Sequence, residues 1–387
     1  MFMKKYLSFF DKLNLNFVEV GWIMNNYIEK KIIRIMEIFN THIHTFIDKD
    51  VPRKFLPLGL VRILSTKIGF NIIAKGLNFL NPLSSDDQFK KYVRFATIGK
   101  LGSQEKIFEE CAKFYPEGTK FVVLSVDMKY MNAGKVPRNF SEQIEELGQL
   151  AKKYEQIIPF IHIDPRRPGY FDMLRHAVED LGFKGVKLYF PLGYFPTDER
   201  LHMVYDYCER HNLPIISHCG PCTPTYNHSS KKTIREWLGD YPYSKKDNKR
   251  TLCSHFANPK NYIPILEKYP NLKICMAHFG SECSVENFLK NPTDKENWFY
   301  IIKEMIQKYP NLYTDISFTL NNQEYFSVLK IYMNNEKIRE KILFGSDYYM
   351  VETEAEEKKF SFDLRAYLGE DYFNIIANIN PKKFLQS

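Results

Sequence analysis

Two histidines separated by a single residue form the clearest chemical signal in this chain of 387 residues. They are His42 and His44, and they follow a short apolar run that is typical of a strand. Side chains two positions apart on a strand point to the same side, so both imidazoles can reach one cation. Imidazole is a good ligand for zinc, iron or nickel. Alone, the pair is only moderately specific, because such histidines also occur on ordinary surfaces and in cores.

Three more polar residues stand at the ends of other predicted strands: His218, His278 and Asp347. In a parallel barrel the carboxyl ends of all strands meet at one face. These residues should therefore join the first pair, although the five span 305 positions (347 − 42). Three histidines and an aspartate are a usual ligand set for catalytic zinc, with one position left open for water. A divalent metal ion, most simply zinc, is the expected cofactor.

Eight short apolar runs provide the strands that must position these residues. Each is rich in β-branched or aromatic residues and ends in polar residues or glycine, as expected of strands buried on both faces. The runs are residues 37–41, 121–126, 157–163, 185–190, 214–217, 272–277, 312–316 and 342–345. Amphipathic helices alternate with them; Thr197 is expected to cap one and Asn258 to open another. The pattern predicts an α/β fold, a (β/α)8 TIM barrel, with a doubly wound open sheet as the alternative.

Three segments stand apart from this repeating pattern. Residues 1–35 are interpreted as an N-terminal extension, and residues 36–387 as the barrel itself. A helical insertion is expected after the first strand, at about residues 51–112, and a loop-like insertion after the fifth, at about residues 220–258. Both insertions should lie above the face where the strands end and a substrate binds.

Composition argues against several classes of protein. The net charge is +8, but the lysines are scattered in short pairs, which argues against nucleic-acid binding. No apolar stretch is long enough for a membrane span, and early charged residues argue against a signal peptide. An odd number of cysteines, seven, fits a reducing compartment, so a cytoplasmic location is expected. The expected partner is a small-molecule substrate, and self-association into a homo-oligomer is left open.

With these residues in place, the chain resembles the amidohydrolase superfamily, and within it the amidohydrolase-related (amidohydrolase 2) branch. The resemblance runs from about residue 36 to the C-terminus, and its motifs are specific only in combination. The matching positions are His42 and His44, Lys187 in Gly-Val-Lys-Leu-Tyr, His218 in Ile-Ser-His, His278 in Ala-His-Phe-Gly, and Asp347 in Phe-Gly-Ser-Asp. The resemblance implies a (β/α)8 fold and a divalent metal that activates water. Asn40 departs from the pattern, because many members carry aspartate two residues before the first histidine.

The resemblance also implies a role for each of these residues. The ligands of a single metal ion would be His42, His44, His218 and Asp347. Asp347 would also act as general base, His278 would polarise the substrate oxygen, and Lys187 would orient the substrate. One ion is expected rather than two; a second ion would be held by Lys187 and His278.

Residues near the ends of other strands are further candidates. Asp127 follows the second strand, while Arg166 and Arg167 follow the third and could grip a substrate carboxylate. Ordinary salt bridges within loops are the favoured alternative for these three. Asp315, at the end of the seventh strand, is expected to support the ligands from behind. His162 is expected to be a strand histidine and not a ligand.

The predicted function is hydrolysis of an amide, lactone or ester-like bond in a small molecule by metal-activated water. A non-hydrolytic, metal-dependent decarboxylase of the same superfamily is the first alternative, and a barrel that has lost catalysis and only binds a ligand is the second. Cys219-Gly-Pro-Cys222 raises a thioredoxin-like redox protein as a third. A redox dithiol needs its first cysteine at the start of a helix, and Thr-Pro-Thr-Tyr is a poor helix start. A local disulfide between these cysteines, or a thiolate near the metal, stays open.

Overall fold

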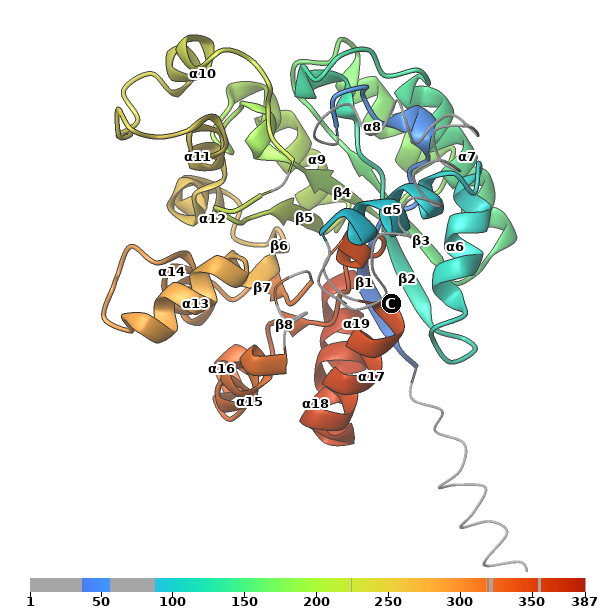
Figure 1. Ribbon diagram of the computed structural model, residues 1–387, viewed down its shortest axis with the longest axis vertical. Coiled ribbons are helices and arrows are strands. Elements are labelled where there is room, and N and C mark those ends of the chain that lie inside the picture. The colour runs from blue at the N-terminus through green and yellow to red at the C-terminus, as the bar shows by residue number, and fades with distance from the viewer. Residues whose placement is uncertain are drawn as a thin grey trace, which may run out of the picture. The chain divides into compact units, whose positions relative to one another are not determined.

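The computed structural model describes residues 37–55, 88–223, 225–317, 319, 323–353 and 356–386. The expected extension at residues 1–35 and the apolar part of the first insertion, residues 56–87, lie outside these ranges. Eight parallel strands follow one another in chain order, with helices outside them (Figure 1). The strands are β1 (Phe39–Ile43), β2 (Lys120–Leu124), β3 (Ile157–His162), β4 (Gly185–Leu188), β5 (Ile215–His218), β6 (Ile274–Ala277), β7 (Leu312–Asp315) and β8 (Ile342–Leu343).

The first and last strands meet and close the sheet into a barrel. The amide of Asp347 donates to the carbonyl of His42 at 2.8 Å, and Ile43 pairs with Tyr348 in an isolated parallel bridge. This closure confirms the predicted (β/α)8 fold and excludes the doubly wound open sheet, whose outer strands stay apart. Each of the eight observed strands overlaps the range predicted for it.

The inside of the barrel is a packed apolar core. Alternate residues of a strand point to the same face. Val122 and Leu124 of β2 accordingly belong to the same buried cluster as Cys275 and Ala277 of β6. Phe384, near the C-terminus, joins that cluster. Because side chains fill the barrel, a substrate can reach the strands only at their ends.

Helices connect the strands on the outside of the barrel. They are α5 (Gln88–Gly99), α6 (Gln104–Ala112), α7 (Phe140–Lys153), α8 (Tyr170–Glu179), α9 (His202–Arg210), α10 (Lys231–Leu238), α11 (Lys249–Ser254), α12 (Ile263–Lys268), α13 (Glu282–Lys290), α14 (Trp298–Lys308), α15 (Phe326–Met333), α16 (Glu336–Arg339), α17 (Glu357–Leu368), α18 (Glu370–Asn374) and α19 (Asn380–Leu385). Within the ranges given above, none of these helices combines the length and the apolar character that crossing a bilayer requires.

Two helix starts test the predicted caps. Asn258 caps the 3-10 turn Pro259–Tyr262 with its side chain, with proline in the first turn, as predicted. At the other start the cap is Asp198 and not Thr197: its carboxylate accepts from the amide of Arg200 at 3.0 Å. The turn that begins there leads directly into α9, so the prediction was displaced by one residue.

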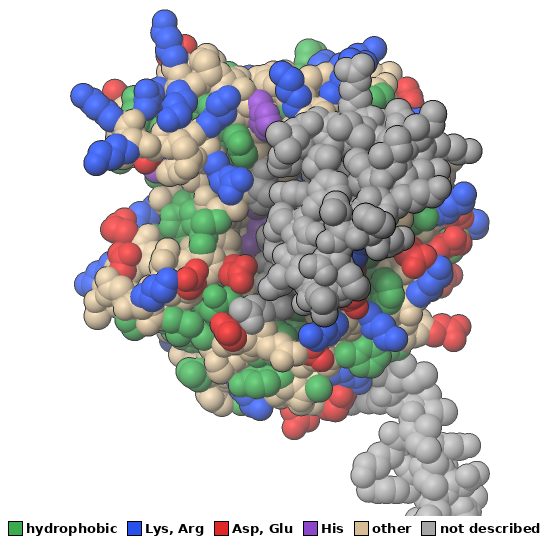
Figure 2. All heavy atoms as spheres, in the orientation of Figure 1, with side chains coloured by type: hydrophobic (Ala, Val, Ile, Leu, Met, Phe, Trp, Pro, Cys, Tyr) green, Lys and Arg blue, Asp and Glu red, His purple; other side chains and the backbone are tan. Residues whose placement is uncertain are grey.

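The connection after β5 is not the loop-like insertion that was predicted. It contains α10 and α11, which form an outer corner of the fold (Figure 1). Ser230 and Asn248 cap them, each accepting a hydrogen bond from a backbone amide three residues later. Ile234 and Leu238 are buried and attach α10 to the protein. Lys and Arg side chains are dense over this corner (Figure 2), so the insertion is helical and basic.

Candidate metal centre

The strand ends bring histidines and an aspartate to one buried place. His42, His278 and Asp347 each offer a ligand atom, and these atoms lie within 4.8 Å of one another. All three side chains are buried. They come from β1, from the turn after β6 and from the turn after β8. The convergence expected of a parallel barrel is therefore present for these three.

The other three candidates border this group. Nε2 of His44 lies 3.3 Å from Oδ1 of Asp347. Nδ1 of His218 lies 3.0 Å from Nε2 of His278. The Lys187 ammonium lies 3.3 Å from Nε2 of the histidine in β1. All six candidates thus share one site. Its tightest group includes His278, whereas the ligand set expected from the sequence includes His44 and His218 instead.

Hydrogen bonds fix how three of the imidazoles present themselves. In each, Nδ1 lies 2.9 Å from an oxygen acceptor: Oδ2 of Asp315 for His42, the carbonyl of Leu124 for His44, and the carbonyl of Ser317 for His278. A carbonyl or carboxylate oxygen can only accept, so each Nδ1 carries a proton, and in the neutral imidazole Nε2 then keeps its lone pair. Three Nε2 atoms are thereby left able to bind a metal ion or a proton.

Asp315 supports the site from behind, as expected. Besides binding the ring of His42, it accepts hydrogen bonds from the amides of His278 at 2.9 Å and of Ser317 at 3.1 Å. Burial opposes ionisation, but the neighbouring His42 and His278 hold the pKa of Asp315 well below its usual range. One buried carboxylate therefore orders the ring of His42 on β1 and the turn after β6 together.

The backbone at two of the site residues is strained. His278 has φ +70° and Asp347 has φ +64°, in the left-handed region that non-glycine residues rarely adopt. Such conformations cost on the order of 1–3 kcal/mol and are concentrated at functional sites. Gly345 permits the close approach of the two chain segments here, because a Cβ on it would lie 2.8 Å from Cβ of His42. The sequence Gly-Ser-Asp after β8 is therefore shaped by the site.

Burial sets the protonation states of the site. It lowers the pKa of His42 to about 3, and it lowers the pKa of His218 and of His278. Burial also lowers the pKa of Lys187 to about 8. For Asp347 burial acts in the opposite direction, but nearby imidazoles hold its pKa below the usual value. At neutral pH the imidazoles of His42, His218 and His278 are neutral and the carboxylate of Asp347 is ionised, the forms that bind a metal.

The geometry of His44 and Asp347 fits a divalent ion. Nε2 of His44 lies 3.3 Å from Oδ1 of Asp347, and in the neutral imidazole with its proton on Nδ1 both of these atoms are acceptors. Oδ1 has no hydrogen-bond partner among the residues that the structure describes. Buried polar atoms are nearly always paired, and two facing acceptors need a proton or a cation between them. Imidazole nitrogens and a carboxylate oxygen are the ligands that zinc commonly takes.

A cavity of about 270 Å³ opens over these residues. The six candidates line it together with apolar side chains, among them Phe46, Phe55, Met128, Tyr189 and Met350. Its size and its mixture of an apolar wall with a few polar groups are typical of a site for a small molecule.

The candidate substrate-binding residues that follow the second and third strands do not line this cavity. Arg166 is paired with Asp164 at 2.6 Å, and Arg167 with Asp127 at 2.5 Å. Asp127 and Arg167 line a second cavity of about 250 Å³ instead. Within each pair the opposite charges neutralise each other, as expected if these residues form loop salt bridges and do not bind substrate. The predicted substrate-binding residues are Lys187, Arg166 and Asp127. Of these, Lys187 lines the cavity of about 270 Å³ that the histidines border, the histidine cavity.

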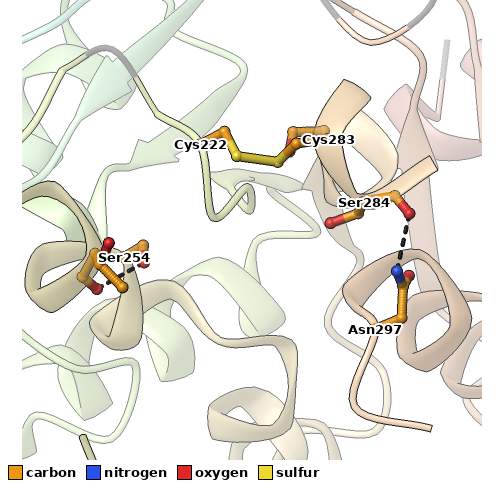
Figure 3. The surroundings of a disulfide bond; sticks show 7 residues. Cys222, Ser254, Cys283, Ser284 and Asn297 are labelled. Atoms are coloured by element: carbon orange, nitrogen blue, oxygen red, sulfur yellow. Dashed lines mark hydrogen bonds between the residues drawn. A yellow bond between two sulfur atoms is a disulfide. The ribbon is translucent and has the colours of Figure 1, made fainter. Parts of the chain in front are cut away.

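A disulfide joins Cys222 to Cys283 (Figure 3). It connects the turn after β5 with the first turn of α13, and both cysteines line the histidine cavity. Cys219 is buried and free, and burial raises the pKa of its thiol. No helix begins at Cys219, so nothing activates it. The thioredoxin-like alternative and the local Cys219–Cys222 bridge are both contradicted, because Cys222 has a different partner 61 residues away.

Sequence reasoning missed three residues that shape the site. Cys283 gave no local signal, since its partner is distant in the sequence. The ring of Tyr189 stacks on His218 at 4.5 Å between ring centres. Oγ of Ser317 lies 3.1 Å from Nδ1 of His42. Tyr189 stands two positions after Lys187 within the predicted run 185–190, so alternation along a strand could have found it, whereas Ser317 lies beyond the strand that ends at Asp315.

A closed parallel barrel with this site at its strand ends defines a TIM-barrel enzyme of the metal-dependent hydrolase type. The model of the amidohydrolase family matches residues 133–386, and the chain belongs to that family. The matched range includes His218, His278 and Asp347, whereas His42 and His44 precede it.

Solved structures agree on the fold. An uncharacterised TIM-barrel protein of Bordetella bronchiseptica is 17% identical with a TM-score of 0.50, over 90% of this chain and 98% of that one. A structure described as amidohydrolase II is 12% identical with a TM-score of 0.51, over 91% of this chain and 100% of that one. At such identities the likeness extends to the fold alone. No match was found among curated proteins.

Proposed function

We propose that this enzyme hydrolyses an amide, lactone or ester-like bond in a small molecule, with one divalent ion, most simply zinc, as cofactor. The observation that carries the proposal is the buried group of His42, His278 and Asp347 within 4.8 Å, at the base of a cavity. A bound metal would act as a Lewis acid and bring the pKa of a water molecule toward neutrality. Membership of the amidohydrolase family supports this type of chemistry.

The ligands proposed for the ion are His42, His44, His218 and Asp347. Asp347 is also the proposed general base, because its carboxylate is ionised and keeps a second oxygen for a proton when Oδ1 binds the ion. Lys187 is proposed to orient the substrate, since its ammonium lies on the cavity wall.

His278 is proposed to carry a proton rather than only to polarise the substrate oxygen. The carbonyl of Ser317 holds the ring proton on Nδ1, so Nε2 is an acceptor; it lies 3.0 Å from Nδ1 of His218, and both rings line the cavity. It can receive a proton and pass it to the leaving group. Polarising an oxygen by a hydrogen bond would first require that Nε2 be protonated.

The variant His278→Asn separates these roles. We expect zinc, measured by elemental analysis, to remain near one ion per chain, while kcat falls by about 100-fold or more. The control is His162→Asn, which alters a buried histidine that does not line the cavity; its activity at neutral pH should match the wild type. Loss of zinc together with activity would make His278 a ligand. Two ions per wild-type chain would favour Lys187 and His278 as ligands of the second.

Two further results would overturn the proposed function. A folded wild-type protein that binds no divalent metal under any loading would exclude metal-dependent hydrolysis and revive the non-catalytic binding module. Release of carbon dioxide, without incorporation of oxygen from labelled water, would identify a decarboxylase. The sequence left open that an arginine binds a substrate carboxylate. In the described part of the chain, no arginine lines the histidine cavity, so this role has no support.

We also propose that the enzyme works in the cytoplasm. Five free, buried cysteines support a reducing compartment, whereas the Cys222–Cys283 disulfide is unusual in one. Cell fractionation followed by detection of the chain would test this location, and recovery outside the cytoplasm would contradict it.

A further inference from the structure

A buried glutamate lies behind the seam where the barrel closes. Glu357 stands in the first turn of α17, and its side chain is fully buried. The hydroxyl of Tyr115 donates a hydrogen bond to its Oε1. Tyr115 itself lies between α6 and β2, far from Glu357 in the sequence. This contact plays no part in the chemistry proposed above, so it needs its own explanation.

Asn40 links Tyr115 to the backbone on either side of the metal site. Its Nδ2 donates to the Tyr115 hydroxyl at 2.9 Å and to Oγ of Ser346 at 2.8 Å. Its Oδ1 accepts from the amides of Ser346 at 3.1 Å and of His42 at 3.3 Å. Ser346 directly precedes Asp347. Asn40 therefore fastens the β1 segment to the β8 turn at the point where both supply site residues.

The surroundings of Glu357 are acidic or neutral. The titratable groups that face it are Tyr115, Cys111, Glu352, Asp347 and Tyr348. The nearby cation Arg94 is engaged with Glu352, its Nε lying 3.7 Å from that carboxylate. Within the described ranges, no lysine or arginine is paired with Glu357. Burial and the adjacent carboxylates raise the pKa of Glu357 to about 8, so it is a neutral acid at pH 7.

We propose that Glu357 is a positioning residue for Asp347, acting through Tyr115, Asn40 and Ser346. The buried carboxyl accepts from Tyr115 and fixes its hydroxyl. The fixed hydroxyl restricts the Asn40 side chain to one orientation. In that orientation Asn40 hydrogen-bonds both Oγ and the backbone amide of Ser346. These hydrogen bonds keep Asp347 in its left-handed backbone conformation, φ +64°, with Oδ1 facing His44. The inference rests on the proposed role of Asp347 as ligand and base.

Three variants test this role at pH 7: Glu357→Gln, Glu357→Leu and Tyr115→Phe. Glutamine keeps an acceptor oxygen of similar size for Tyr115, so zinc affinity and kcat should stay within about twofold of the wild type. Leucine removes the acceptor, and phenylalanine removes the hydroxyl. Each should weaken zinc binding, measured against a competing chelator, by about tenfold or more, and lower kcat more than it raises KM.

The results separate positioning from mere packing. If the leucine and phenylalanine variants unfold more easily but bind zinc and turn over like the wild type, the proposal is wrong. If the glutamine variant is as impaired as leucine, the neutral carboxyl is not the working form and the proposal also fails. If Glu357→Leu does not fold, Tyr115→Phe, which removes a single oxygen atom, tests the positioning role by itself.

A second measurement does not depend on activity. Free glutamate titrates near pH 4.3 and this one near pH 8, so ionisation of the unfolded chain erodes wild-type stability as pH rises between these values. The stability of Glu357→Gln relative to the wild type should therefore increase from pH 5 to pH 8. A constant difference would overturn the inference. If the wild type binds no zinc at all, the proposed function falls first and this role falls with it.

Discussion

At the scale of single residues, one carboxylate organises much of the site. Asp315 contacts the ring of His42 and the amides of His278 and Ser317 at the same time. It thereby selects the tautomer of His42 that leaves Nε2 free for a metal. Its importance was predicted only in outline, because a strand-end position shows that a side chain faces the site but not which atoms it binds.

The variant Asp315→Asn should weaken zinc binding by about 10- to 100-fold. The amide has a single acceptor oxygen, so it cannot satisfy the donors of both His42 and His278, and its NH2 group would face one of them. Competition with a chromophoric chelator measures the dissociation constant. The matched control is Asp164→Asn, which alters another buried strand-end aspartate, one paired with Arg166. Equal affinities in the two variants would contradict the role of Asp315.

At the scale of elements, local patterns predicted the strands but not what lies between them. All eight strands were found because each is a short apolar run that ends in polar residues or glycine. The corner formed by α10 and α11 was read as loop because the segment is polar. Its start signals, Ser230 and Asn248, are single residues that also occur in turns. Burial of Ile234 and Leu238 stabilises the helix, and only the tertiary structure shows where these side chains pack.

The disulfide between Cys222 and Cys283 ties the turn after β5 to α13. Cross-linking residues 61 positions apart restricts the unfolded chain, an effect worth roughly 4 kcal/mol in the chain-entropy picture. We expect Cys222→Ser with Cys283→Ser to lower the free energy of unfolding by up to about that amount, measured by denaturant titration. A reductant should destabilise the wild type and leave the double variant unchanged. Equal sensitivity of the two proteins would show that the bond is absent in solution.

At the scale of the whole molecule, acid should unfold the metal-free protein through its buried histidines. Burial lowers the pKa of His162 to about 4 from an ordinary value of 6.5. Below pH 6.5 the unfolded chain binds a proton that the folded chain excludes, so stability is complete above pH 6.5 and falls toward pH 4. This histidine alone would contribute a loss of about 3 kcal/mol, at about 1.4 kcal/mol per pKa unit.

Chemical denaturation from pH 7.5 to pH 4 measures this loss. The variant His162→Asn keeps an acceptor for the amide of Asp127, which the imidazole binds at 2.9 Å, but it does not titrate. Its stability should decline less steeply over the same range. An identical slope would mean that His162 is already protonated or solvated in the folded protein.

The architecture as a whole was readable from the sequence, whereas the detailed chemistry of the site was not. Strand ends in a parallel barrel converge whatever their spacing in the chain, so His42, His278 and Asp347 could be placed together without any contact being known. The atoms that orient the imidazoles include backbone carbonyls, that of Leu124 for His44 and that of Ser317 for His278. Their positions depend on backbone conformation that no residue pattern encodes.

The seam between β1 and β8 also bears on how the protein is made. A ribosome synthesises His42 and His44 early and Asp347 only 305 residues later (347 − 42). The turn that aims Asp347 is held by the carbonyl of His42 and by Asn40, and β1 can accept β8 only once the last strand has been released. A nascent chain therefore carries both imidazoles without Asp347 through nearly all of its synthesis. If the four proposed ligands bind a metal ion, the set becomes complete only at the end of translation, after the final strand has emerged.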